Sequence, residues 1–217
     1  MKWSEQVWTE ILPIYHKILE LPFIAELMDG TLPREKFIFY INQDRLYLAE
    51  YGKILAGIMS RVKKSEHAKA FLKFSTDTVY VEGSLHETYL SQSEQAKIVE
   101  PSPSCLLYTG HLHQVLATAP VETAIAAVLP CFKIYKKVGE YILENCTTTN
   151  NPYKQWIDTY GGTEFEEAVT QAMAICDELA EACSKEQQQS MTDAFVRSAK
   201  LEWMFWDSAW RMEQWAV

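Results

Sequence analysis

Hydrophobic positions recur at intervals of three and four residues through most of the chain, which is typical of amphipathic helices. Within residues 4–20, for example, Val7, Ile11, Ile14 and Ile18 lie on or near one helical face. No stretch shows sustained alternation of apolar and polar residues with β-branched enrichment, which is the pattern of a half-buried strand. The hydrophobic pattern therefore predicts an all-α fold.

Prolines, glycines and capping residues divide this pattern into about eight helices. Ser65 is a candidate N-cap, and capping boxes begin at Thr163 and at Ser184. Polar and proline-containing stretches at 92–103 and 147–152 read as loops. No linker or internal repeat divides the chain, so residues 1–217 are predicted to form a single domain. The helices are expected at about 4–20, 21–29, 33–63, 65–91, 104–117, 118–146, 163–183 and 184 to near the C-terminus.

One predicted helix carries a proline at its centre, in the segment 126–135. Pro130 frees the carbonyl four residues earlier and bends the helix axis. Cys131 follows directly, and Tyr135 lies one turn further on the same face. A thiol beside a kink, with a phenol within reach, resembles a nucleophile at the bottom of a pocket. The alternative is a buried cysteine that acts as a small hydrophobic residue.

Asp44 lies near the middle of the longest predicted helix and shares a face with Tyr47. A carboxylate among aromatic side chains is unfavourable unless it is hydrogen-bonded. Such a group suits recognition of an amino group on a flat ring. The alternative is that Asp44 pairs with Arg45 or Lys53 on a solvated face.

Glu202 lies in the last predicted helix, on one face with Phe205 and Ala209. A glutamate in an apolar wall is expected to have a raised pKa, as a general acid needs near neutral pH. The alternative is an aromatic core stripe with Glu202 at its edge. The adjacent face carries three tryptophans, Trp203, Trp206 and Trp210.

Charge and cysteine content exclude several classes of protein. The formal net charge is −9 and no basic stripe is present, which argues against nucleic acid or an anionic membrane as the main partner. No apolar run approaches the length of a membrane span, and the first residues lack a signal-peptide core. Five irregularly spaced cysteines without a C-x-x-C motif argue against disulfides or zinc and favour a reducing cytoplasm.

No metal or phosphate-binding pattern is present either. Glu82 and His86 are four residues apart, whereas di-iron bundles repeat a Glu-x-x-His spacing on two helices. His111 and His113 alternate and therefore point to different helical faces. A glycine-rich phosphate loop is also missing. We therefore expect neither a metal ion nor another cofactor.

Taken together, several short motifs resemble the TenA/thiaminase II family over nearly the whole chain. No single motif is decisive, but their order matches. They are Leu21-Pro22-Phe23, Asp29-Gly30-Thr31-Leu32-Pro33, Tyr40-Ile41-x-Gln43-Asp44, Glu82-x-x-x-His86, Leu129-Pro130-Cys131, Val138-Gly139-Glu140, Trp156-x-x-x-Tyr160 and Glu202-x-x-Phe205-Trp206.

The resemblance implies a helical bundle similar to haem oxygenase, usually a homotetramer. It also implies hydrolysis of 4-amino-5-aminomethyl-2-methylpyrimidine, a thiamin degradation product, to the hydroxymethyl pyrimidine used in thiamin salvage. Thiamin itself would be cleaved more slowly. Two other functions are weighed against this one: a regulatory or adaptor protein without catalysis, and an oxygenase-like bundle with altered chemistry.

The family's site residues carry over by position. Cys131 would be the nucleophile that adds to the pyrimidine ring, and Glu202 would protonate a ring nitrogen. Asp44 would accept a hydrogen bond from the ring amino group. Pocket shape and ring packing would come from the aromatic residues Tyr47, Tyr108, Tyr135, Tyr160 and Phe205.

Two residues depart from the family pattern. Arg45 stands where an aromatic residue usually follows Gln-Asp, and Leu21 replaces the usual histidine of His-Pro-Phe. These changes bear on substrate preference more than on reaction class. Cys131 is similar to the nucleophile of the cysteine-bearing branch of the family; another branch lacks this residue.

Overall fold

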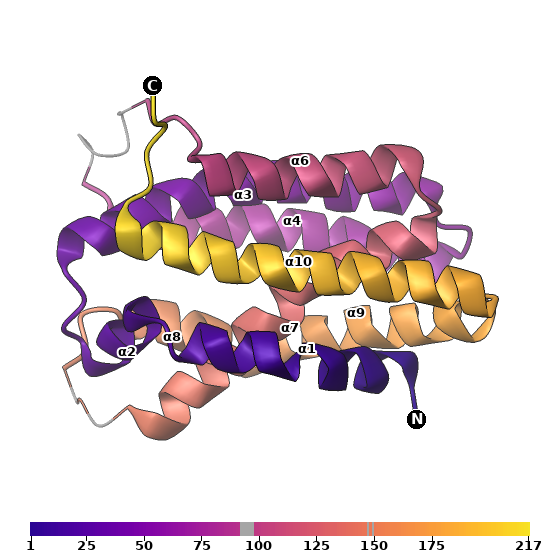
Figure 1. Ribbon diagram of the computed structural model, residues 1–217, viewed down its shortest axis with the longest axis horizontal. Coiled ribbons are helices and arrows are strands. Elements are labelled where there is room, and N and C mark those ends of the chain that lie inside the picture. Colours follow the sequence, from indigo (N-terminus) through magenta and orange to yellow (C-terminus); the bar gives the residue numbers. More distant parts are fainter. Residues whose placement is uncertain (92–97, 147, 149) are drawn as a thin grey trace.

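The computed structural model describes residues 1–91, 98–146, 148 and 150–217, except the side chains at 81, 82, 84–86 and 164. No strand occurs among these residues, so the predicted all-α fold is confirmed. The described helices are α1 (Trp3–Leu19), α2 (Pro22–Asp29), α3 (Arg34–Arg61), α4 (Ser65–Tyr89), α6 (Pro103–Thr118), α7 (Val121–Asn145), α8 (Lys154–Gly161), α9 (Thr163–Glu181) and α10 (Lys185–Arg211) (Figure 1).

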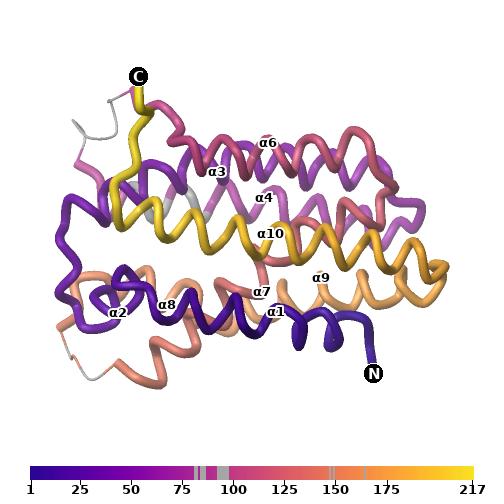
Figure 2. Tube along the Cα trace, viewed as in Figure 1, coloured from indigo at the N-terminus to yellow at the C-terminus, as the bar shows by residue number. Residues whose placement is uncertain are grey.

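The last helix, α10, runs along the bundle and packs against α7, α1, α6 and α3 (Figure 1). Helix α3 pairs with α4, and α7 packs against the two helices that follow it, α8 and α9. The chain ends lie toward opposite ends of the long axis (Figure 2). The two helices with candidate catalytic residues, α7 and α10, are therefore in direct contact at the centre of the fold.

Two expectations about the helices between α7 and α10 were wrong. Helix α8 was not predicted, because it spans only eight residues between a loop and the pair Gly161-Gly162. Helix α9 does start at Thr163, but its N-cap is Gly162 and no side chain caps it. The capping box at Ser184 is confirmed. Ser184 Oγ accepts a hydrogen bond from the backbone N–H of Gln187, and the Gln187 side-chain oxygen accepts one from the backbone N–H of Ser184.

Helix α7 continues through Pro130, as the sequence predicted. Near this proline the Tyr51 hydroxyl of α3 donates a hydrogen bond of 2.8 Å to the Val128 carbonyl. A phenol from a neighbouring helix thus satisfies a backbone acceptor next to the site where proline interrupts the helical hydrogen bonds. The contact ties α3 to α7 immediately before Cys131.

None of the described helices combines the length and the apolar content needed to cross a membrane. In the part of the chain that the structure describes, His, Cys, Asp and Glu side chains form no group of three placed to hold a metal ion. The side chains of Glu82 and His86 lie outside the described residues.

Candidate active site

A cavity of about 880 Å³ lies among α3, α4, α7, α8 and α9. Buried polar side chains line its inner part: Asp44 and Tyr51 from α3, Cys131 and Tyr135 from α7, and Tyr160 from α8. Exposed residues of α4 and α9 line its outer part, including Lys73, Tyr80 and Glu167. The fold therefore brings a thiol, a carboxyl group and three phenols to the surface of one cavity.

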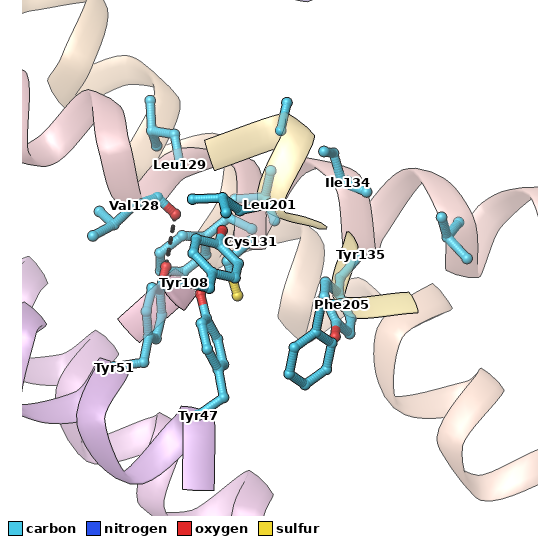
Figure 3. Packing of buried hydrophobic residues seen from close by; sticks show 14 of the residues in the cluster. Tyr47, Tyr51, Tyr108, Val128, Leu129, Cys131, Ile134, Tyr135, Leu201 and Phe205 are labelled. Atoms are coloured by element: carbon cyan, nitrogen blue, oxygen red, sulfur yellow. Dashed lines mark hydrogen bonds between the residues drawn. The ribbon is translucent and has the colours of Figure 1, made fainter. Parts of the chain in front are cut away.

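Cys131 faces the tyrosine side chains of α3 at this surface. In Figure 3 its sulfur points toward Tyr47, with Tyr51 and Tyr108 nearby and Phe205 approaching from α10. Burial raises the pKa of the Cys131 thiol well above its usual value, and the neighbouring Glu202 raises it further. The neighbouring Tyr47 and Tyr51 hydroxyls act in the opposite direction and lower this pKa. The resting residue is therefore a neutral thiol.

Glu202 is buried on α10, with 1% of its surface exposed. The Tyr108 hydroxyl donates to its Oε1 atom at 2.8 Å. Burial raises the pKa of Glu202 to about 8; the Tyr108 hydrogen bond lowers it and the nearby Asp44 raises it. At neutral pH this carboxyl group therefore holds a proton that it can release to a base, which is the requirement for a general acid.

A chain of hydrogen bonds fixes the tyrosines on the far side of the cavity. The Trp156 indole donates to the Tyr40 hydroxyl at 3.1 Å, and Tyr40 donates to Tyr135 at 3.4 Å. The Tyr135 ring packs on Tyr160 with centroids 4.9 Å apart. Burial holds the pKa of Tyr135 and of Tyr160 well above the usual value. Both phenols are thus neutral hydrogen-bond donors.

Three of the predicted residues, Tyr47, Tyr108 and Phe205, form a buried wall next to Cys131 and are not among the residues that line the cavity. Glu202 lies in this wall too. The Tyr47 ring is 4.9 Å from Tyr108 and 5.7 Å from Phe205, measured between centroids. These are contact distances for two rings, so no third ring fits between them. A flat ligand therefore cannot be sandwiched between these rings.

The burial of Asp44 bears on the two alternatives for this residue. Asp44 is buried, with 2% of its surface exposed, so it does not lie on a solvated face. Lys53 pairs instead with Glu50 at 2.6 Å. The sequence motifs left Tyr51 out of the candidate site, although it follows Tyr47 by one helical turn on the same face. That spacing was the available signal for its place in the cavity.

Comparisons with known proteins show which family the chain resembles. The family model of the TENA/THI-4/PQQC family matches residues 8–212. An aminopyrimidine aminohydrolase from Bacillus subtilis is 31% identical over 220 residues, which cover 100% of this chain and 93% of that protein. The solved structure of a TenA homologue from P. horikoshii OT3 is 27% identical, with a TM-score of 0.84 over 97% of this chain and 99% of that one.

A second solved structure, of lower sequence identity, supports only the similarity of the fold. A domain with a heme oxygenase-like fold from Shewanella denitrificans superimposes with a TM-score of 0.76 at 14% identity, covering 96% of this chain and 92% of that domain. The expected likeness to haem oxygenase is therefore confirmed. Because the family model covers almost the whole chain, the protein belongs to the TENA/THI-4/PQQC family.

Proposed function

We propose that the protein hydrolyses aminopyrimidines in thiamin salvage. Its favoured substrate would be 4-amino-5-aminomethyl-2-methylpyrimidine, converted to the 5-hydroxymethyl pyrimidine and ammonia, with slower cleavage of thiamin. The observation that carries this proposal is the convergence of three helices on one site: Asp44 and Cys131 line the cavity, and Glu202 lies in the buried wall next to Cys131. The names of full-length relatives support the same reaction.

Asp44 would orient the substrate. Its carboxyl group lines the cavity with Cys131 and accepts hydrogen bonds, so it suits the exocyclic amino group of the pyrimidine. The neutral phenols of Tyr135 and Tyr160 would donate to acceptors on the ligand. The cavity volume of about 880 Å³ exceeds that of a single pyrimidine, which leaves room for a larger substituent toward the mouth.

The chemistry would begin with bond formation between the Cys131 sulfur and a ring carbon. This addition breaks aromaticity, so a ring nitrogen must be protonated in the same step, and Glu202 supplies that proton. The substrate amine is bound as an ammonium group, so electrons from the ring expel it as ammonia while an exocyclic double bond forms. Water adds to this double bond and loses a proton. The C–S bond then breaks, and the ring N–H proton returns to the leaving thiolate, which restores the aromatic ring and the Cys131 thiol. Ammonia and the hydroxymethyl product account for all atoms.

The same residues offer a path for the thiol proton. The Tyr47 hydroxyl lies beside the Cys131 thiol and the Tyr108 hydroxyl without a hydrogen bond to either at rest, and Tyr108 is hydrogen-bonded to Glu202. When Glu202 gives its proton to the ring, it becomes a carboxylate. It can then regain a proton from Cys131 through the two phenols. Thiolate formation would thus be coupled to ring protonation, although each group is neutral at rest.

Replacing Asp44 tests the binding role. Asp44→Ala should lower kcat/KM by roughly ten- to a hundredfold, since loss of a charge-assisted hydrogen bond costs about 1.5–3 kcal/mol. Asp44→Asn should keep part of the binding, because its amide oxygen is a neutral acceptor. Steady-state kinetics with the aminomethyl pyrimidine measure both variants. An Asp44→Ala protein within twofold of the parent would rule out contact with the substrate.

The two alternative functions explain fewer of the residues found at the site. A regulatory or adaptor protein has no use for a thiol, a carboxylic acid and several phenols around an enclosed cavity. An oxygenase that binds haem through a proximal histidine would need that residue at the cavity, and none of the described lining side chains is a histidine. Hydrolysis uses the residues that are present.

We further propose that the protein acts in the cytoplasm as a homotetramer, without a nucleic acid partner. The net charge of −9 supports the absence of nucleic acid binding. Exposed leucines on α6, Leu106 and Leu107, supply apolar surface for contact between subunits. Light scattering should give four times the chain mass across micromolar concentrations, and a monomer mass would refute the assembly.

A further inference from the structure

Lys136 is buried on α7, five residues after Cys131, and the proposed reaction does not use it. Only 6% of its side chain is exposed. Its ammonium group donates to the carbonyl oxygens of Gly161 at 3.0 Å and Gly162 at 3.1 Å. A buried ammonium is unfavourable unless acceptors replace water, so these two contacts account for its position.

The two carbonyls belong to the corner where α8 ends and α9 begins. The last carbonyl groups of a helix have no partner within the helix, and a cation near them is favourable. Helix α8 has no basic residue in its own last turn, and Lys136 of α7 supplies the cation from another helix. Glu140 and Glu166 lie 3.7 and 3.5 Å from the same ammonium and balance its charge.

Backbone packing holds the same corner one turn along α7. A Cβ atom added to Gly139 would lie 2.7 Å from the Gly161 amide nitrogen and 2.7 Å from the Tyr160 carbonyl carbon. Glycine is therefore required for this close approach. Lys136 and Gly139 together fasten the corner to the helix that carries Cys131.

The corner is also a wall of the cavity. Tyr160, Gly162 and Thr163 line it, and they lie directly beside the two carbonyls that Lys136 holds. The Tyr160 ring packs on Tyr135 of α7 and on Phe165 of α9. A displacement of the corner would therefore move Tyr160 and widen the cavity on the side of α8 and α9.

We propose that Lys136 is a positioning residue, which fixes the corner at Gly161 and Gly162 against α7 and thereby sets the position of Tyr160 and the width of the cavity. Its effect on turnover rests on the proposed function. Its effect on access to Cys131 does not, because access is measured by alkylation in the absence of substrate.

The test uses two variants that release the corner in different ways. Lys136→Met removes the ammonium and keeps the side-chain length, and Gly139→Ala pushes α8 away from α7. Lys137→Met is the matched control, because Lys137 is the next residue and pairs with Glu140 at 2.6 Å. Peptide mapping follows alkylation of Cys131 by small iodoacetamide and by a bulky maleimide. Labelling of the buried Cys176 reports global unfolding.

In Lys136→Met and Gly139→Ala, the ratio of the maleimide labelling rate to the iodoacetamide labelling rate at Cys131 should rise about tenfold or more, while Cys176 stays unlabelled. In the same proteins kcat/KM should fall, whereas Lys137→Met and the charge-conserving Lys136→Arg should resemble the parent. Unchanged labelling ratios in Lys136→Met and Gly139→Ala would overturn the proposal. Simultaneous labelling of Cys176 would do so too, because Lys136 would then support the whole fold. A parent without turnover on aminopyrimidines would refute the proposed function and leave the labelling test intact.

Discussion

Replacing Cys131 by serine is expected to lower ammonia release at least about a hundredfold while the protein stays folded. A serine hydroxyl at neutral pH is a far poorer nucleophile than a thiolate, and the bond to the ring carbon would no longer form. The volume change is small, so the packing of α7 against α10 should persist. Initial rates from a coupled ammonia assay, together with circular dichroism, measure both effects.

Cys105 provides the matched control. It is a buried thiol on α6 whose sulfur faces the Gln43 carbonyl at 3.6 Å, and it does not line the cavity. Cys105→Ser should retain most of the activity per folded protein. A Cys131→Ser protein that kept more than about a tenth of the parental turnover would exclude thiolate attack, since even a lost general acid usually costs more.

Replacing Glu202 by glutamine should lower turnover by about 10²–10⁴-fold, because an amide cannot deliver a proton to the ring. Cys131 and Glu202 act in the same step, so the double variant should be little worse than either single one. Effects that multiplied in the double variant would show that the two residues act in separate steps. The same kinetic assay decides the point.

The pH dependence of activity gives a second test of Glu202. With a pKa of about 8, the carboxyl group is protonated below that pH, so parental turnover should fall as pH rises through about 8. Residual turnover of Glu202→Gln should not show this decrease. A parent whose turnover stayed constant well above pH 8 would contradict a role of Glu202 as the acid.

The pH dependence of folding stability should also reflect the protonation of Glu202. The folded Glu202 carboxyl keeps its proton up to about pH 8, whereas the ordinary pKa of a glutamate, as in the unfolded chain, is 4.5. Between these values the folded state binds more protons, so its stability decreases as pH rises across this window. Thermal unfolding should show this decrease in the parent and a smaller one in Glu202→Gln.

The sequence was sufficient to predict the all-α fold, because helical periodicity and capping residues are local signals. It was less informative where contacts between distant segments decide the outcome. Helix α8 is too short to show a clear period, and the corner at Gly161 and Gly162 is held by Lys136 from another helix. Spacing alone could not reveal that contact.

In the candidate site, too, local patterns could be read from the sequence and contacts between distant segments could not. Spacing placed Asp44 and Cys131 on aromatic stripes, and the family resemblance named Glu202 as their partner. The hydrogen bond between Tyr108 and Glu202 joins residues 94 positions apart, and the Tyr51 contact with Val128 spans 77 positions. Pairings over such separations depend on how the helices pack, so the pattern within one helix could not predict them.

The most direct test of the central claim is the reaction itself. Purified protein is incubated with 4-amino-5-aminomethyl-2-methylpyrimidine in water labelled with heavy oxygen, and ammonia and product mass are followed together. We predict one ammonia for each hydroxymethyl pyrimidine, with the heavy oxygen in the new hydroxyl group. Ammonia release no faster than with the Cys131→Ser protein, or a product without the label, would contradict a hydrolase that uses Cys131.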